Sequence, residues 1–534
     1  MGDKFYNTSV LLKLILRRER ITSSVWILLI AGFVSLLATG VTVALDEPSR
    51  AEMVLVLNNP AMVAMIGPII GGDVPTFGAM YTTLMLLFTA IAVVVMNVMF
   101  VVRHTRADEE KGRYEVVRSL PTGRLAHLSA TIIATIVINV ILAILTGIGL
   151  FLMGDESMCL NGSILWGALL GAVGLVFAAI AAVFSQLSAN SKGAMGYSLF
   201  AMGIFYMVRA VGDVSVPALS LVSPLGLILQ AEAYEANYWW PVFVLIGIAI
   251  PITLLACRLN LTRDIDQGLL PDKQGKAEGG RLLKTPFGLA LKLTKTGLIV
   301  GFTTIFLIGA SYGAIMGDID GFIEANEFYQ QMIMHVEGIS LPILFAGLIN
   351  FVAGMMALIP MIIYVKQARS EEKDIRAELV LATPVCRYTY LGSYVIIAYV
   401  SSVILQLLTT FGLWMSGVAV LPEPEEFPLG TLLTANLVYL PAIWVIIGLT
   451  VLLIGVAPKM TGLIWAVYGG VFLLGMFGRM DIFPAWVNNL SPFGFVPQYP
   501  MEDINWISMI VLTGIAALLT VAGLIGFRNR DIKA

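Results

Sequence analysis

The chain has 534 residues, of which 58% are hydrophobic and only 13% are charged, and its formal net charge at pH 7 is −3. Ordinary soluble proteins carry about 25% charged residues, so this composition excludes that class. It indicates an integral membrane protein surrounded by a lipid bilayer, with no nucleic-acid partner.

Twelve apolar runs are long enough to cross a membrane as helices, which takes about 20 residues each. The fifth and eleventh are the weakest, because glycine and arginine interrupt them. In chain order the runs cover 24–45, 79–102, 126–152, 163–187, 193–212, 239–260, 296–316, 340–365, 390–418, 432–456, 460–480 and 505–526. The predicted fold class is therefore an all-α polytopic membrane protein with twelve transmembrane helices.

The basic residues predict the orientation of these helices. If the N-terminus is cytoplasmic, all of the 32 lysines and arginines except Arg50, Arg209 and Arg479 fall in inner segments. Because cytoplasmic loops collect lysine and arginine, we expect both termini inside a multi-pass protein of the plasma membrane.

The charged loop at 107–130, "ADEEKGRYEVVRSLPTGRLAHLSA", has a second copy at 369–393, "RSEEKDIRAELVLATPVCRYTYLGS". Glu109, Glu110, Glu115, Pro121 and Arg124 recur there as Glu371, Glu372, Glu378, Pro384 and Arg387. In this correspondence Asp374 replaces Gly112, and one residue is inserted before Glu378. Internal recurrence of this kind indicates a duplicated architecture.

Two further sequence segments recur in the second half of the chain, at nearly the same separation as the two charged loops. "SPLGLILQAEAYEANYW" begins at Ser223 and "SPFGFVPQYPMEDINWI" at Ser491, while "TRDI" at 262–265 recurs as "NRDI" at 529–532. Each copy holds six spans and starts inside, which predicts two parallel repeats. We expect a first six-helix repeat at 1–265, a cytoplasmic linker at 266–290 and a second repeat at 291–534.

The loop after the second span has the pattern of a short amphipathic helix at the membrane surface. Its acids begin a predicted helix whose first turn favours negative charge, Tyr114, Val117 and Leu120 lie on one side, and Pro121 ends it. Glutamates contribute little to topology. Their recurrence in both halves therefore favours a protein-docking element over a solvated connector.

The first loop resembles the EExGxxExxxxxPxxR pattern at the coupling helix of type 2 ABC exporter permeases. The resemblance is greatest to the large duplicated permeases associated with resistance to polyketide and polyether-ionophore antibiotics. It implies that each loop helix binds a separate ATP-hydrolysing subunit. The implied contact or positioning residues are Glu109, Glu110, Glu115, Arg124, Glu371, Glu372, Glu378 and Arg387, and Gly112, Pro121 and Pro384 would shape the backbone.

The chain contains no GxxxxGK[ST] phosphate loop, and pieces such as "GALLGAVG" lie inside apolar runs that favour close helix packing. We therefore expect no enzyme activity, no metal and no cofactor in this chain. ATP and Mg would bind in the partner, a nucleotide-binding ATPase present in two copies per chain.

Four polar residues at membrane depth are candidates for an outer gate or a substrate contact: Arg209, Arg479, Asn97 and Asn350. The alternative for the arginines is a local ion pair, with Asp213 and Asp481, or snorkelling to headgroups, and the alternative for the asparagines is interhelical hydrogen bonding.

The expected function is ATP-driven export of hydrophobic or amphipathic small molecules, with antibiotics and ionophores suggested by the resemblance alone. The alternative is a proton-coupled drug transporter of the major facilitator type, which also has twelve helices in two parallel halves.

Overall fold

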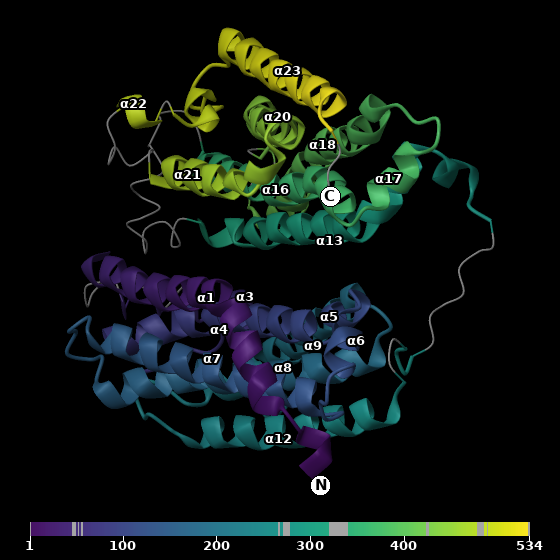
Figure 1. The fold of residues 1–534 in the computed structure, drawn as a ribbon. Helices are drawn as coiled ribbons and strands as arrows, with labels where there is room; N and C mark the ends of the chain where they lie inside the picture. The colour runs from purple at the N-terminus through teal and green to yellow at the C-terminus, as the bar shows by residue number, and fades with distance from the viewer. Residues whose placement is uncertain are drawn as a thin grey trace. The chain divides into compact units, whose positions relative to one another are not determined.

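A computed structural model describes residues 2–44, 50–51, 53–54, 57–264, 267–270, 278–319, 340–422, 425, 427–477, 485–488 and 490–531. The chain divides into two compact units, Met1–Gln274 and Gly275–Ala534. The division falls inside the segment 266–290 that was predicted to be a linker. In Figure 1 each unit is a bundle of long helices, the first coloured purple to teal and the second teal to yellow.

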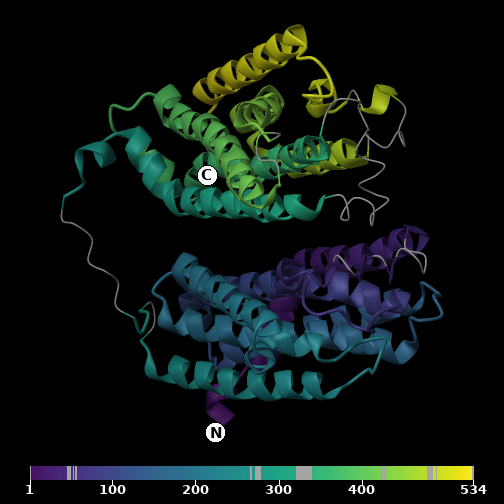
Figure 2. The same ribbon diagram turned by 180° about the vertical axis from the view of Figure 1, so that it is seen from behind.

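The described part of the first unit consists of helices joined by turns. In chain order these are η1 (Gly2–Phe5), α1 (Thr8–Ala44), α3 (Pro60–Ile66), α4 (Phe77–His104), α5 (Arg106–Glu110), α6 (Arg113–Arg118), α7 (Ala126–Phe151), α8 (Leu160–Leu187), α9 (Ser191–Val214), α10 (Pro217–Ser220), α11 (Pro224–Leu229) and α12 (Trp240–Thr262). The long helices α4, α7, α9 and α12 pack against the central helix α8. Figures 1 and 2 both show α12 along one side of the unit.

Helix α1 begins at Thr8, well before the apolar run predicted at 24–45. The charged turn before that run is helical because it has partners inside the unit. Arg18 lies 2.7 Å from the Asp108 carboxylate, and Glu19 lies 3.0 Å from the Arg103 guanidinium. Such pairing offsets part of the cost of placing these charges against the rest of the unit.

Glycines in α8 allow the neighbouring helices to approach closely. A Cβ on Gly167 would lie 2.1 Å from the Ala143 carbonyl oxygen of α7, and one on Gly174 would lie 2.4 Å from Asn139 Oδ1. Small residues are typical of such helix contacts in membranes. The interpretation of "GALLGAVG" as a packing sequence is confirmed.

The described part of the second unit is also helical. It contains η2 (Arg281–Lys284), α13 (Pro286–Ala314), η3 (Met316–Asp318), α16 (Leu341–Lys373), α17 (Arg376–Leu381), α18 (Arg387–Val420), α19 (Leu429–Leu437), α20 (Leu440–Val456), η5 (Pro458–Met460), α21 (Leu463–Phe477), α22 (Ala485–Asn488), η7 (Pro492–Phe495) and α23 (Trp506–Asn529).

Eleven helical segments among the described residues are long and apolar enough to cross a membrane. They correspond to eleven of the twelve predicted spans, with α19 and α20 together forming the span Leu429–Val456. The remaining predicted span, 460–480, contains α21, whose apolar part Leu463–Gly475 is shorter, and residues 478–480 lie outside the described part. The chain is a polytopic helical membrane protein, while the twelfth span and the cytoplasmic placement of both termini stay predictions.

The helices of the two units have matching neighbours. In the first unit α1 packs on α7, α4 on α8, and α8 on α12, while in the second α13 packs on α18, α16 on α20, and α20 on α23. The two SP-G segments also match: the hydroxyl of Ser223 accepts a hydrogen bond from Leu225 N, and that of Ser491 accepts one from Phe493 N. These recurrences support the predicted duplication.

Gly167→Ala should destabilise the protein, because the new methyl group would meet a backbone carbonyl that no rotamer change can move. Overpacking of this kind costs about 1–3 kcal/mol. Gly203→Ala in α9, where a Cβ would have no neighbour within 4 Å, is the matched control and should be neutral. Thermal unfolding of the two detergent-solubilised variants measures the difference, and equal melting temperatures would contradict the close α7–α8 contact.

Candidate functional site

The first charged loop forms two short helices instead of the single one predicted. Helix α5 ends at Glu110, and Gly112 adopts a left-handed conformation with φ of 67° before α6 begins. Glycine takes this conformation without strain. Tyr114 is buried, Val117 is half-buried, and Leu120, beyond the end of α6, is 59% exposed. The amphipathic helix at the membrane surface stays a prediction.

Glu109 is the centre of what we call the first loop cluster: Arg106, Glu109, Arg124 and Arg263. Its carboxylate is 4% exposed and accepts two hydrogen bonds from Arg263, at 2.9 and 2.5 Å. Arg106 lies 3.1 Å from the same carboxylate, and Arg124 donates to the Arg263 carbonyl oxygen at 2.8 Å. The cluster therefore joins the loop after α4 to the start of α7 and to the segment that follows α12.

The second unit has the same arrangement in the second loop cluster: Arg369, Glu372, Arg387 and Arg530. Glu372 is 1% exposed and accepts two hydrogen bonds from Arg530, both at 2.6 Å. Arg369 lies 2.8 Å from its carboxylate, and Arg387 donates to the Arg530 carbonyl oxygen at 2.6 Å. The arginine of "TRDI" in one unit and of "NRDI" in the other thus has the same role.

These contacts correct the correspondence between the two loops. Glu109 matches Glu372, and the pair Asp108–Arg113 at 3.0 Å matches Glu371–Arg376 at 2.7 Å. Within the two loops every matched position is 263 residues apart, with no insertion. Ile375 has a φ of 63° and takes the place of Gly112. The predicted match of Glu110 with Glu372, and of Asp374 with Gly112, is therefore wrong, since Glu110 corresponds to Lys373.

Burial separates the predicted contact residues into two groups. Glu109, Glu371 and Glu372 are buried in ion pairs of their own unit. Glu115 and Glu378 are exposed in the first turns of α6 and α17.

The remaining predicted positions lie at the edges of the loops. Glu110 is exposed and accepts hydrogen bonds from the backbone N–H and the hydroxyl of Ser191, at 3.0 and 2.5 Å. Pro121 and Pro384 are exposed, and the Pro121 carbonyl oxygen accepts a hydrogen bond from Asn7 at 2.8 Å.

Two apolar side chains are exposed beside the exposed glutamates. Val116 follows Glu115 and is 67% exposed, and Leu379 follows Glu378 and is 74% exposed. Like the glutamates, they are 263 residues apart. Each loop helix thus presents a carboxylate and an aliphatic side chain outward at the same position.

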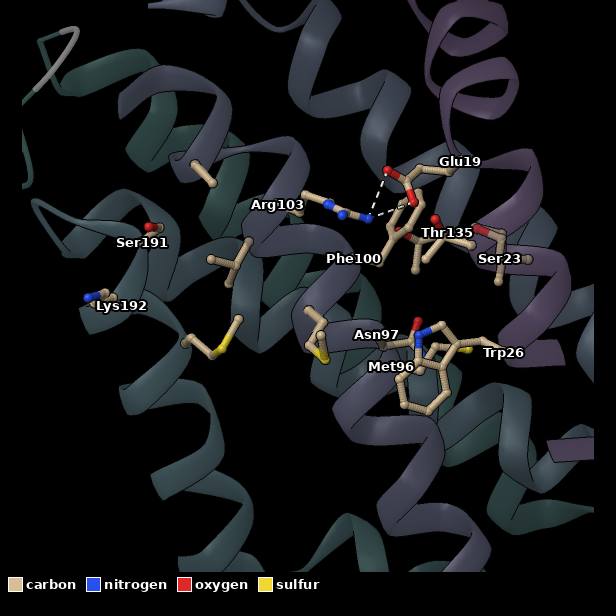
Figure 3. Close-up of a pocket in the computed structure, with 16 residues that line it drawn as sticks. Glu19, Ser23, Trp26, Met96, Asn97, Phe100, Arg103, Thr135, Ser191 and Lys192 are labelled. Atoms are coloured by element: carbon tan, nitrogen blue, oxygen red, sulfur yellow. Dashed lines mark hydrogen bonds and ion pairs between the residues drawn. The ribbon is translucent and has the colours of Figure 1, made fainter. Parts of the chain in front are cut away.

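Asn97 and Asn139 form a satisfied pair inside the first unit. Asn139 donates to Asn97 Oδ1 at 2.6 Å, Asn97 donates to Asn139 Oδ1 at 3.1 Å, and both are 1% exposed. Interhelical hydrogen bonding between α4 and α7, the alternative to a substrate contact, therefore accounts for both amides. Asn97 also lines a cavity of about 290 Å³ between α1, α4, α7 and the start of α9 (Figure 3).

Asn350 lies in a different environment in the second unit. Its amide nitrogen donates to the Leu432 carbonyl oxygen at 3.4 Å, and the nearby Asn436 donates to Thr410 at 2.6 Å. Among the described residues, Asn350 Oδ1, Asn436 Oδ1 and both polar atoms of the Gln406 amide have no hydrogen-bond partner. All three amides are fully buried. This part of the second unit has hydrogen-bonding capacity that its own side chains do not use.

Arg209 is fully buried and holds α9 to the residues of α3. Its guanidinium lies 3.0 Å from Asp213 and donates to the carbonyl oxygens of Ala64 and Met65, at 2.5 and 3.3 Å. The local ion pair with Asp213 is confirmed, and snorkelling to headgroups is excluded by the burial. Arg479 and Asp481 lie outside the described residues, and a gate at either arginine stays a prediction.

A comparison with known protein families gives one match that covers most of the chain. Residues 12–258 and 283–528 match the family described as "Multidrug efflux system permease Rv1217c, C-terminal domain". The chain belongs to this permease family.

The multidrug efflux system permease protein Rv1217c of Mycobacterium tuberculosis (strain ATCC 25618 / H37Rv) is 30% identical to this permease over 537 residues. The alignment covers 100% of this chain and 96% of the relative. The similarity therefore runs along the full length of this chain and nearly all of the relative.

The sequence did not reveal the arginines that hold the buried glutamates. Arg263 and Arg530 belong to the recurring segments "TRDI" and "NRDI", whose recurrence does not show which side chains they contact. Arg106 and Arg369 precede the matched acids by three residues, the spacing of an ion pair along a helix. The recurrence of this three-residue spacing in both loops was the one sequence signal that could have identified these ion pairs.

Glu109→Gln and Glu372→Gln should each destabilise the permease, because they leave the buried arginines around Glu109 and the half-buried arginines around Glu372 without their carboxylate. Losing one partner of a buried ion pair costs about 3–5 kcal/mol. The exposed Glu115→Gln and Glu378→Gln are matched controls from the same loops and should unfold like the unchanged protein. Melting temperatures in detergent test this, and equal values for all four variants would contradict the cluster assignment.

Arg209→Gln should reduce the amount of folded permease in the membrane, because Asp213 is left buried without its cation. The double variant Arg209→Gln with Asp213→Asn removes both charges and should recover part of the loss. Quantitative blotting of membrane fractions measures both. Normal levels of the single variant together with lost transport would instead favour the gate.

Proposed function

We propose that this chain is the membrane-spanning subunit of an ATP-driven ABC exporter, which moves hydrophobic or amphipathic compounds out of the cell. The proposal is based mainly on one observation: the same arrangement of a charged loop and its ion pairs occurs in both units. Each short helix presents an exposed carboxylate and aliphatic residue, and an ion-pair cluster fixes the residues just before that helix to the end of its unit.

The loop clusters supply the mechanical connection that such a subunit needs. A force on α6 would reach the segment after α12 through Glu109 and Arg263, and a force on α17 would reach the segment after α23 through Glu372 and Arg530. Bidentate arginine–carboxylate pairs have a defined geometry and resist sliding. Movement of the loop helices would therefore be passed to the transmembrane helices.

The ATPase would be a separate nucleotide-binding subunit, with ATP and Mg bound there and one copy for each loop helix. The exposed faces of α6 and α17 are small, as expected of one helix docking into a groove of a partner. Phosphoryl transfer in the partner would supply the energy, and this chain would convert it into helix movement.

Membership of a multidrug efflux permease family supports export of drug-like compounds. An antibiotic or an ionophore fits the proposal, and so does any compound with an apolar body that partitions into the bilayer. The major facilitator alternative differs from this proposal in its energy source. Efflux from proteoliposomes that stops without ATP and persists without a proton gradient supports the ABC mechanism, and the opposite result supports the alternative.

Glu115→Lys combined with Glu378→Lys should abolish co-purification of the ATPase and lower drug efflux at least tenfold, since both exposed docking carboxylates are reversed. The control combines Glu156→Lys with Asp503→Lys, which reverses two exposed acids away from α6 and α17. Because all four positions are exposed, the membrane levels of both variants should stay normal. Full efflux in the first variant would contradict the proposed docking role of α6 and α17.

A further inference from the structure

The cavity of the first unit has a charged end and a largely apolar end, which also includes the Asn97 amide. Glu19 and Arg103 lie at one end, joined by hydrogen bonds of 3.0 and 3.1 Å, and Trp26 and Met96 lie at the other, as Figure 3 shows. Phe100 lies between these ends on α4. Aromatic and methionine side chains adapt to apolar ligands of different shapes. Its volume of about 290 Å³ suits a small amphipathic molecule or one end of a larger one.

Glu19 is the buried charge of this cavity. Its side chain is 5% exposed, and besides Arg103 it has His104, whose Nε2 lies 3.2 Å from the carboxylate. The neighbouring Asp108 is different, because it is held by two arginines, Arg18 at 2.7 Å and Arg113 at 3.0 Å. Of these two carboxylates, Glu19 is the one that depends on a single arginine.

The arginine that neutralises Glu19 is also the more easily released partner. The Arg103 side chain is 51% exposed, so its guanidinium can return to water while the carboxylate stays in place. Lys192, the other cation that lines the cavity, is exposed and screened by solvent. An arriving cation would therefore meet a buried, poorly hydrated carboxylate and exposed, hydrated competitors.

The same geometry disfavours an anion. An anionic head would compete with Glu19 for Arg103 and would be repelled by the buried Glu19 carboxylate. The aromatic faces of Trp26 and Phe100 add to the difference, since ring faces attract cations.

We propose that this cavity binds lipophilic monocations, with the ammonium or an equivalent cation displacing Arg103 from Glu19 and the apolar body lying against Trp26, Met96 and Phe100. The inference rests on the proposed function in taking the ligand as a transported compound. Binding itself needs neither ATP nor a partner subunit, so the two can be tested separately.

The test measures equilibrium binding to the full-length permease in lipid nanodiscs, using three probes that share a naphthyl group. They are (1-naphthylmethyl)trimethylammonium, its uncharged carbon analogue 1-neopentylnaphthalene, and the anion 1-naphthaleneacetate. The cation should bind at least tenfold more tightly than either of the others. Equal binding of the cation and the uncharged probe, or tightest binding of the anion, would overturn the proposal.

Glu19→Gln should remove the preference for the cation while leaving the uncharged probe unaffected. Arg103→Gln should instead tighten binding of the cation several-fold, because the competitor for Glu19 is gone. A variant that was merely damaged could not bind more tightly. Glu156→Gln, at an exposed acid outside the cavity, is the matched control and should bind all three probes like the unchanged protein. Weaker cation binding by Arg103→Gln would contradict the proposal that the cation displaces Arg103 from Glu19.

The two proposals fail in different ways. If the cation binds with the expected preference but ATP and the partner ATPase do not drive its export, the binding site is supported and the exporter mechanism is contradicted. If ATP drives export of uncharged or anionic compounds while the cation shows no preferential binding, the exporter stands and this site is overturned.

Discussion

The buried ion pair between a loop glutamate and an arginine beyond the last helix is the contact on which each unit depends. Removing charges from water is costly, and a bidentate arginine offsets that cost only where the geometry is well defined. Glu109 with Arg263 and Glu372 with Arg530 meet this condition. Each pair connects segments more than 150 residues apart in the chain, so the loop helices are positioned by tertiary contacts more than by their own propensity.

The two units share this glutamate–arginine ion pair but differ in the polar residues of their interiors. In the first unit the asparagines of α4 and α7 satisfy one another, and a cavity with a buried glutamate lies beside them. In the second unit Asn350, Gln406 and Asn436 leave polar atoms without partners among the described residues. The two loops are therefore alike while the polar interiors of the two units differ.

Arg209 illustrates how burial excludes one of the roles that a sequence leaves open. A charge near the end of an apolar run is equally compatible with headgroup contact, an ion pair or a gate. Full burial against Asp213 and two backbone carbonyl oxygens makes it part of the helix packing around α3 and α9. A residue with that many fixed partners can change position only if several hydrogen bonds break together.

The sequence by itself determined the class of fold, because apolar length and charge placement depend on the bilayer and not on neighbouring helices. It also located both loops and the packing glycines of α8, since recurrence and small residues are local signals. Only the tertiary structure decided which acids are exposed, how the two loops align and where Glu19 lies. Those properties depend on arginines distant in the chain, such as Arg263 for Glu109 and Arg103 for Glu19, and no local pattern specifies which distant cation a carboxylate will meet.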